Sequence, residues 1–254
     1  MQLTLSMFLI VCPLVFLASF IDAIAGGGGL ISLPAYLLAG VPIHNSIATN
    51  KLSSCIGTLF STIRYCKNKY ADLASAIPSI VAALIGSAIG AKLSMTVSER
   101  FLQYILIIIL PITAYIVLKK KNCQETTLSS MKRGHIILLA TLISLVIGAY
   151  DGFYGPGTGT FLILLYTGVC KMDIKTASGN TKLVNFSSNL AALVTFVVNG
   201  QIIVPLGLTA SLFSIAGHYI GSGLVMKKGT AIVSPIIICV LVLLFIKIIS
   251  QFML

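Results

Sequence analysis

The chain has 254 residues, of which 57% are hydrophobic and 9% are charged, and its mean hydropathy is +1.04. Because these values lie far outside the range of soluble domains, they exclude a soluble protein and predict an all-α polytopic membrane protein, with the lipid bilayer as a partner. The formal net charge of +11 does not indicate nucleic acid as a partner, since the basic residues lie in short loops between apolar runs, where they set the orientation of the spans.

Eight apolar runs are long enough to cross a membrane, because each is close to the roughly 20 residues that a spanning helix requires. They lie at 3–21, 46–65, 73–94, 101–118, 134–150, 176–198, 202–225 and 231–253. The first run precedes Ala23-Ile24-Ala25, which resembles a signal-peptide cleavage site, but no basic segment comes before the run. We therefore expect this run to stay in the mature protein.

Aspartate followed by a glycine-rich turn occurs twice, as Asp22-Ala-Ile-Ala-Gly-Gly-Gly-Gly29 and as Asp151-Gly-Phe-Tyr-Gly-Pro-Gly-Thr-Gly159. Each glycine run leads into a short apolar stretch, so each is predicted to interrupt a discontinuous helix. We call Gly26–Gly29 the first break and Gly155–Gly159 the second break. Irregular backbone at membrane depth is tolerated only where it is buried in protein or lines a cavity. The two breaks therefore indicate a transport site.

The breaks belong to a duplication, in which residues 22–118 align with residues 151–249. Both halves also contain a G-x-x-x-G pair, a spacing that lets two helix backbones approach closely, and we interpret these pairs as packing seams. The matched positions are Asp22 with Asp151, Gly26 with Gly155, Lys51 with Lys182, and Gly86–Gly90 with Gly217–Gly221. The expected domains are a first transmembrane repeat at 1–118, a linker at 119–133 and a second transmembrane repeat at 134–254.

The linker is strongly basic, from Lys119-Lys-Lys121 to Lys132-Arg133, and the positive-inside rule places it in the cytoplasm. Lysines 171, 175, 227 and 228 also fall inside if the second break carries the chain back across the membrane. Applied to both halves, this crossing gives an odd number of passes per half, so the two homologous repeats are inverted. The alternative is a parallel arrangement with four passes per half and two re-entrant loops.

The glycines of both breaks form the first part of a predicted substrate-binding site. A helix that begins at a break presents backbone amides and the positive end of its dipole, which favour an anion, and glycine lets the ligand approach the main chain. The alternative is that these glycines only permit tight helix crossing. The predicted binding residues here are Gly26, Gly27, Gly28, Gly29, Gly155, Gly157, Thr158 and Gly159.

Lys51 and Lys182 lie a few residues inside apolar runs. An ammonium group there is costly unless it is paired, solvated in a cavity or able to snorkel to the surface. A bound anion would satisfy both lysines, and snorkelling is the alternative. Nearby amide and hydroxyl groups would complete a shell around the anion, including two asparagines one and two turns beyond Lys182. These further predicted binding residues are Thr49, Asn50, Asn180, Thr181, Asn185 and Asn189.

Asp22 and Asp151 are the only acidic residues inside the predicted spans. A carboxylate at this depth is a candidate proton carrier. The alternatives are that it caps neighbouring amides or pairs with the lysines. His218 aligns with Ser87 of the first half, and we interpret it as structural, with proton relay as its alternative role.

Several enzyme motifs are absent from the sequence, which contains no H-E-x-x-H, no G-x-S-x-G and no G-x-x-x-x-G-K-[ST] pattern. The six cysteines are scattered without a C-x-x-C pair, which indicates neither a zinc site nor a disulfide framework. We therefore expect a protein that is not an enzyme and that holds no metal or other cofactor.

Four segments in a fixed order resemble the sulfite exporter TauE/SafE family: Asp22–Pro34, Ala48–Leu52, Asp151–Gly159 and Thr181–Asn189. The resemblance covers essentially the whole chain. It implies a multi-pass permease of the bacterial inner (plasma) membrane that moves small anionic sulfur compounds, such as sulfite or organosulfonates, or related organic acids.

These features predict a secondary carrier or facilitator of a small anion, which is held at the interface between the repeats and moved by alternating access. An anion channel would use the same glycine amides and lysines, and it is the alternative function.

Overall fold

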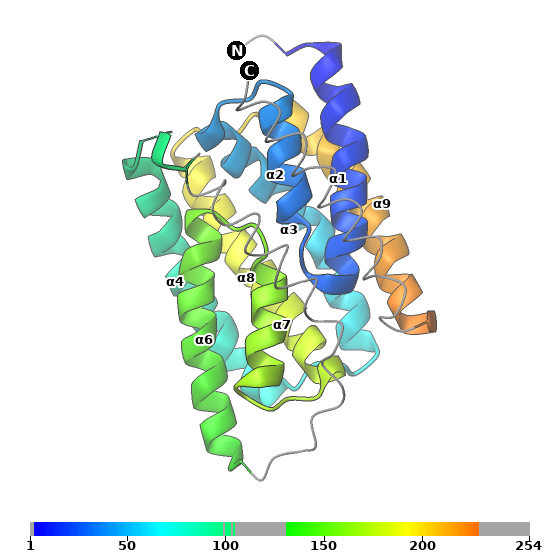
Figure 1. Ribbon diagram of the computed structural model, residues 1–254, viewed down its shortest axis with the longest axis vertical. Helices are drawn as coiled ribbons and strands as arrows, with labels where there is room; N and C mark the ends of the chain where they lie inside the picture. Colours follow the sequence, from blue (N-terminus) through cyan, green and yellow to red (C-terminus); the bar gives the residue numbers. More distant parts are fainter. Residues whose placement is uncertain (1–2, 99, 103, 105–130, 229–254) are drawn as a thin grey trace.

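The computed structural model describes residues 3–98, 100–102, 104 and 131–228 (Figure 1). This part of the chain is all-helical, as the composition predicts. Its helices are α1 Leu5–Ala25, α2 Gly29–Leu38, α3 Ile43–Lys67, α4 Leu73–Thr96, α6 Arg133–Phe153, α7 Thr158–Gly168, α8 Ile174–Val198 and α9 Val204–Lys228. Most of the predicted run at 101–118, most of the linker at 119–133 and the run at 231–253 lie outside the described residues.

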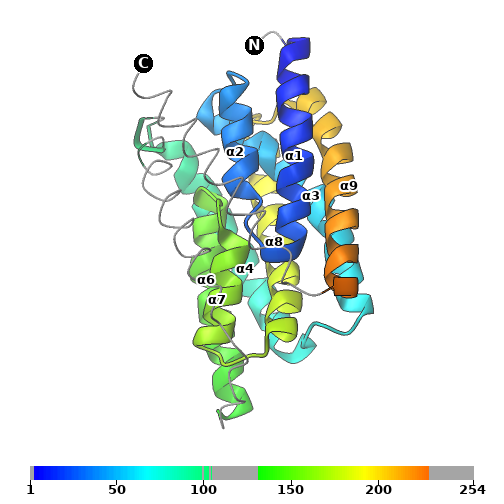
Figure 2. The same cartoon turned by 45° about the vertical axis from the view of Figure 1, so that its right-hand side comes forward.

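Each of the other predicted apolar runs forms a helix. Five of the described helices are long and apolar enough to cross a membrane: α1, α4, α6, α8 and α9. α3 has 25 residues but is more polar, because Lys51 and a series of serine and threonine residues are buried along it. It packs against α2, α8 and α9 in the interior of the bundle (Figure 2), so these polar groups face protein.

The short helices α2 and α7 each run back toward the end of the molecule where the preceding long helix began (Figures 1 and 2). α1 and α6 begin at opposite ends of the bundle. α2 and α7 have 10 and 11 residues, so each is about 15 Å long. This length covers only about half of a membrane core of about 30 Å, so the tips of both hairpins, α1–α2 and α6–α7, lie inside the bundle.

The backbone leaves the helical conformation where the glycines predict it. Gly26 ends α1 with a φ angle of 76°, and Gly155 and Gly157 before α7 have φ angles of 97° and 83°. Glycine adopts this left-handed region readily, whereas a Cβ atom makes it unfavourable for other residues. The helix breaks therefore depend on glycine at these positions.

The long helices approach each other closely at the G-x-x-x-G pairs. A Cβ atom on Gly90 of α4 would lie 2.8 Å from the backbone nitrogen of Phe153 on α6, and one on Gly217 of α9 would lie 2.9 Å from that of Phe20 on α1. Both distances are too short for a real side chain. The interpretation of these glycines as packing seams is confirmed.

One end of the bundle holds the start of α4, α6 and α8. Arg133 at the start of α6 pairs with Asp72 before α4 at 3.4 Å, and the Asp72 amide donates to Asn180 in the second turn of α8 at 2.9 Å. Lys67 ends α3 and Lys175 lies in the first turn of α8, so basic residues collect at this end.

The outer surface is apolar and much of the interior is polar, the reverse of a soluble bundle. Leu9, Val81, Val146 and Leu212 are among the large apolar side chains that are more than half exposed, whereas many serine, threonine and asparagine side chains are buried. An apolar exterior over internally bonded helices suits a lipid environment.

Candidate functional site

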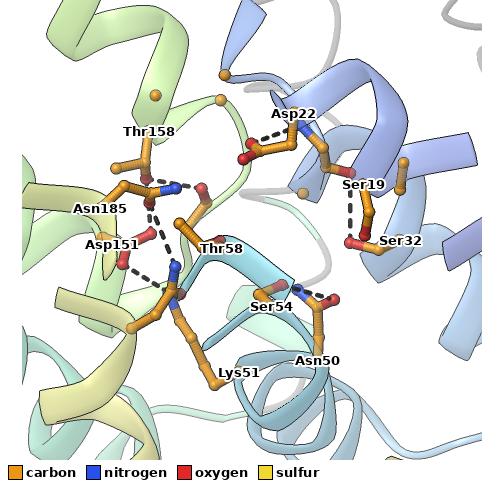
Figure 3. A pocket seen from close by; sticks show the side chains of 18 of the residues that line it. Ser19, Asp22, Ser32, Asn50, Lys51, Ser54, Thr58, Asp151, Thr158 and Asn185 are labelled. Atoms are coloured by element: carbon orange, nitrogen blue, oxygen red, sulfur yellow. Dashed lines mark hydrogen bonds and ion pairs between the residues drawn. The ribbon is translucent and has the colours of Figure 1, made fainter. Parts of the chain in front are cut away.

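A small polar cavity lies where the tips of the two hairpins meet α3, α8 and α9 (Figure 3). Its volume is about 30 Å³, which is enough to hold a water molecule. The lining residues are Ala18, Ser19, Asp22, Gly26, Gly28, Gly29, Ser32, Asn50, Lys51, Ser54, Thr58, Asp151, Gly155, Gly157, Thr158, Gly159, Asn185, Asn189 and His218.

The two hairpin tips touch through their backbones. The amide of Thr160 donates to the carbonyl of Gly26 at 2.9 Å, and the Thr160 hydroxyl donates to the carbonyl of Ala25 at 3.0 Å. A Cβ atom on Gly26 would lie 2.7 Å from Cα of Gly159. Gly26 and Gly159 therefore permit a tight crossing, and both also line the cavity. Their role in substrate binding stays a prediction.

Several amides at the breaks are already used within the protein. The Gly28 amide donates to Oδ1 of Asp22 at 3.2 Å, and the Thr158 amide donates to the carbonyl of Gly155 at 3.2 Å. The amides of Gly29 and Gly159 are not among those used in these contacts. These two residues lie on the cavity wall, where they contribute the first turns of α2 and α7.

Lys51 on α3 forms an ion pair with Asp151 on α6. Its Nζ atom lies 2.8 Å from Oδ2 of Asp151, and both side chains are 3% exposed. The same ammonium donates to Oδ1 of Asn189 on α8 at 2.9 Å. Because Lys51 points into the protein and has two partners there, its side chain does not snorkel to the surface.

Lys182 on α8 forms the second ion pair, with Asp22 on α1. Its Nζ atom lies 3.1 Å from Oδ2 of Asp22, and the Lys182 side chain is 1% exposed. It also donates to the backbone carbonyl of Asp22. Lys182 is therefore paired too, and the snorkelling alternative is wrong for both lysines. Each lysine pairs with the aspartate from the other half of the sequence.

The two carboxylates have different surroundings. Asp151 also accepts hydrogen bonds from the hydroxyls of Ser188 at 2.7 Å and Thr158 at 2.8 Å. Asp22 accepts the amide of Gly28 and lies 3.9 Å from Nε2 of His218. The structure thus contains the amide cap at Asp22 and the lysine pairing at both acids, which were the alternatives to a proton carrier.

The predicted binding residues fall into two groups. Most line the cavity, including Asn50, Asn185 and Asn189, but Gly27 and four others are not on its wall. Thr49 accepts the amide of Ile203 at 3.1 Å, and Asn180 donates to Ser75 at 2.9 Å. Thr181 is fully buried, and its hydroxyl has no partner among the described residues. Lys182 is not on the cavity wall either, but it contacts Asp22, which is.

Sequence reasoning missed five polar residues of the cavity wall: Ser19, Ser32, Ser54, Thr58 and His218. The sequence interpretation of His218 is structural, whereas the residue lines the cavity. Ser54 and Thr58 follow Lys51 by three and seven residues, and Ser19 precedes Asp22 by three. Residues at these spacings share a helix face, so the helical repeat could have identified these three.

Apolar helices of spanning length around a buried polar cavity define a multi-pass membrane protein. The chain belongs to the sulfite exporter TauE/SafE family, whose model, described as "Sulfite exporter TauE/SafE", matches residues 11–248. This membership confirms the resemblance found in the sequence, and the protein is a membrane transporter. Its relatives and its apolar helices fit a multi-pass protein of the bacterial inner membrane.

Relatives of the chain are also named as membrane transporters. The chain is 35% identical over 225 residues to the probable membrane transporter protein YfcA of Escherichia coli (strain K12). The matched region covers 88% of this chain and 82% of the relative. It is 34% identical over 236 residues to the probable membrane transporter protein ORF9 of Sinorhizobium sp. This match covers 93% of the present chain and 90% of the relative. No solved structure matches the chain.

Proposed function

We propose that this protein is a secondary transporter of a small anion, such as sulfite, an organosulfonate or a related sulfur-containing or organic acid. The observation that carries the proposal is the polar cavity between two helix breaks inside an apolar bundle. A buried polar site in a membrane transporter marks the substrate pathway. Discontinuous helices that meet near the midplane form such sites in several transporter folds.

We further propose that the chain consists of two inverted repeats. The opposite starting ends of α1 and α6 support this arrangement, as does the exchange of ion-pair partners between Lys51 and Lys182. The basic residues that collect near Arg133 also agree with it, because the positive-inside rule makes that end cytoplasmic.

The anion would bind at the amides of Gly29 and Gly159 and at side-chain donors of the cavity wall. Asn50, Ser54 and Thr58 present amide and hydroxyl groups from α3, and Asn185 presents one from α8. The lysines would contribute by turning from the carboxylates toward the substrate. Asp22 and Asp151, once released from these pairs, are the candidates for proton coupling.

The small cavity and the contact between the hairpin tips support a carrier over a channel. The cavity has a volume of about 30 Å³, and the Thr160 amide donates to the Gly26 carbonyl at 2.9 Å, so the two hairpins meet directly. In alternating access the two hairpins would separate toward one side at a time. A channel would instead need a continuous opening and would give unitary currents.

Two measurements on the purified protein test this function. Sulfite, thiosulfate, isethionate and acetate are each added in a thermal-unfolding assay, where a ligand at 100 times its Kd stabilises the folded form by about 2.7 kcal/mol. Anions that raise the Tm are then tested for saturable counterflow in proteoliposomes. Unitary currents without counterflow would favour the channel, and an absence of any binding or flux would refute anion transport.

A matched pair of variants assigns the flux to the cavity. Asn50 lines the cavity and its side chain bonds to Ser54 at 3.5 Å, so Asn50→Ala leaves no buried charge unpaired. Loss of one hydrogen bond to the anion is expected to weaken binding by about 1 kcal/mol, or about fivefold. Asn199→Ala, at the exposed end of α8, should leave binding unchanged. Equal binding by the two variants would place the anion elsewhere.

A further inference from the structure

The charges at the cavity balance without a substrate. Lys51 is paired with Asp151 and Lys182 with Asp22, so the two ion pairs together carry no net charge. An anion that enters must therefore compete with two carboxylates for the two ammonium groups. A buried charge that loses its partner is strongly unfavourable, so an added negative charge requires a compensating positive one.

His218 on α9 is positioned to supply that charge. It lines the cavity and is 1% exposed. Its Nε2 atom lies 3.5 Å from the Thr58 hydroxyl and 3.9 Å from Oδ2 of Asp22. Its Nδ1 atom has no hydrogen-bond partner among the described residues. One nitrogen of a buried imidazole is thus next to a carboxylate while the other is unused.

The equivalent position in the other half cannot take this role. Ser87 aligns with His218, and its hydroxyl donates to the carbonyl of Ser188 at 2.6 Å. Asp151 has only donors as partners, Lys51, Ser188 and Thr158, so a proton added to this carboxylate would displace one of them. His218, whose Nδ1 atom has no hydrogen-bond partner among the described residues, lies beside Asp22 and not beside Asp151.

Building on the proposed anion transport, we propose that the protein carries one proton with each negative charge of its substrate, and that the adjacent His218 and Asp22 side chains hold this proton. The proton comes from water on the side where the cavity opens and bonds to an imidazole nitrogen or to a carboxylate oxygen. Lys182 is then released from Asp22 to contact the anion. On the opposite side the anion leaves and the proton returns to water, so no net charge crosses the membrane.

The charged groups around His218 determine whether anion binding favours or opposes proton uptake. On α1, Asp22 favours a charged imidazole, whereas the ammonium of Lys182 on α8 opposes it. On α3, Thr58 is the direct neighbour, Lys51 is bound to Asp151, and Arg64 donates to Tyr219 and Ser222 further along α9. Tyr65 of α3 donates to the carbonyl of Ala23.

An anion that draws Lys182 toward itself removes the opposing charge from His218 and Asp22. Proton uptake therefore becomes more favourable when the anion binds. By linkage, a bound proton raises the affinity for the anion by the same factor. A proton and an anion that stabilise each other in the site are transported together.

The test uses proteoliposomes and a sulfonate, isethionate or ethanesulfonate, whose charge stays constant over the pH range used. Counterflow without any gradient first establishes that the sulfonate is transported. With the membrane potential held at zero, an inward proton gradient should then drive accumulation, by about tenfold per pH unit for one proton per anion. A potential without a proton gradient should produce no accumulation.

Two histidine variants locate the proton. His218→Asn should lose accumulation driven by the proton gradient, whereas His135→Asn, at an exposed position near the start of α6, should retain both counterflow and proton-driven accumulation. Full proton-driven accumulation by His218→Asn would overturn the assignment. Accumulation of the sulfonate by wild-type protein in response to potential alone would overturn electroneutral coupling without requiring any variant. Absence of counterflow in the wild type would instead refute the proposed anion transport itself.

Discussion

Lys51 and Asp151 form a buried ion pair. Replacing the two residues singly and together distinguishes the contribution of this pair to stability from its contribution to transport. Lys51→Met keeps most of the side-chain length but leaves the Asp151 carboxylate buried without its ammonium partner. Breaking a buried pair in this way costs about 3–5 kcal/mol. Asp151 keeps hydrogen bonds from Ser188 and Thr158, so we expect a value near the lower end. At about 2–4 °C per kcal/mol for a chain of this size, Tm should fall by about 6–12 °C.

The double variant Lys51→Met/Asp151→Leu removes both charges and should recover most of this loss, because apolar replacements of a buried pair are often neutral or stabilising. It should still lack transport, since neither the ammonium group nor the carboxylate is present. Thermal unfolding of the purified protein measures the stability, and counterflow in proteoliposomes measures the transport.

A surface ion pair provides the control for this experiment. Arg133 pairs with Asp72 at 3.4 Å, but its side chain is 74% exposed. Exposed pairs contribute only about 0–1 kcal/mol, so Arg133→Met should change Tm by at most about 4 °C. If Lys51→Met is no more destabilising than Arg133→Met, or if the double variant is the least stable protein, the argument from buried charge is wrong.

Three further predictions concern the backbone and a helix cap. Gly26→Ala should lower Tm more than Gly40→Ala. Both positions have positive φ angles, but the new Cβ atom at Gly26 would meet the backbone of the other hairpin, whereas one at Gly40 would meet no atom within 4 Å. Equal losses would show that the contact is unimportant. Gly90→Ala should cost about 1–3 kcal/mol by forcing α4 away from α6, whereas Gly168→Ala meets no atom within 4 Å and should have little effect on Tm. Burial raises the pKa of Asp173, but hydrogen bonds from Thr176 and from the Lys175 amide outweigh it and hold the pKa below its usual value. The cap at α8 therefore stabilises the folded protein above the unfolded-state pKa of about 3.9 and is lost as the pH falls through the lower folded-state pKa. Asp173→Ala should thus cost about 1 kcal/mol at neutral pH and progressively less below about pH 4, and a difference in Tm that does not depend on pH would contradict this explanation.

The helix breaks could be predicted from sequence because a run of glycines after an aspartate is incompatible with a continuous apolar helix. The helical repeat also placed Asn185 and Asn189 near Lys182, and both line the cavity. The same helical repeat, counted from Lys51, leads to Ser54 and Thr58 on the cavity wall. Thr49, which is close to Lys51 in sequence, instead contacts Ile203.

The partners of the buried charges could not be predicted from the sequence. Pairing of lysine with aspartate was one alternative, but the choice between the aspartate of the same half and that of the other half depends on how the halves pack. The role of His218 was also hidden, because a lone histidine in an apolar helix gives no indication of its neighbours. Only the structure brings it within 3.9 Å of Asp22.

The exchanged ion pairs have a consequence for how the protein is made. When the first half has been synthesised and inserted, Asp22 and Lys51 are already in the bilayer, but their partners, Lys182 and Asp151, are still to be translated. Each such charge is unfavourable at the centre of a spanning helix by about 2.5–3.5 kcal/mol. Asp22 and Lys51 therefore gain the partners seen in the structure only after α6 and α8 have entered the membrane beside the N-terminal half.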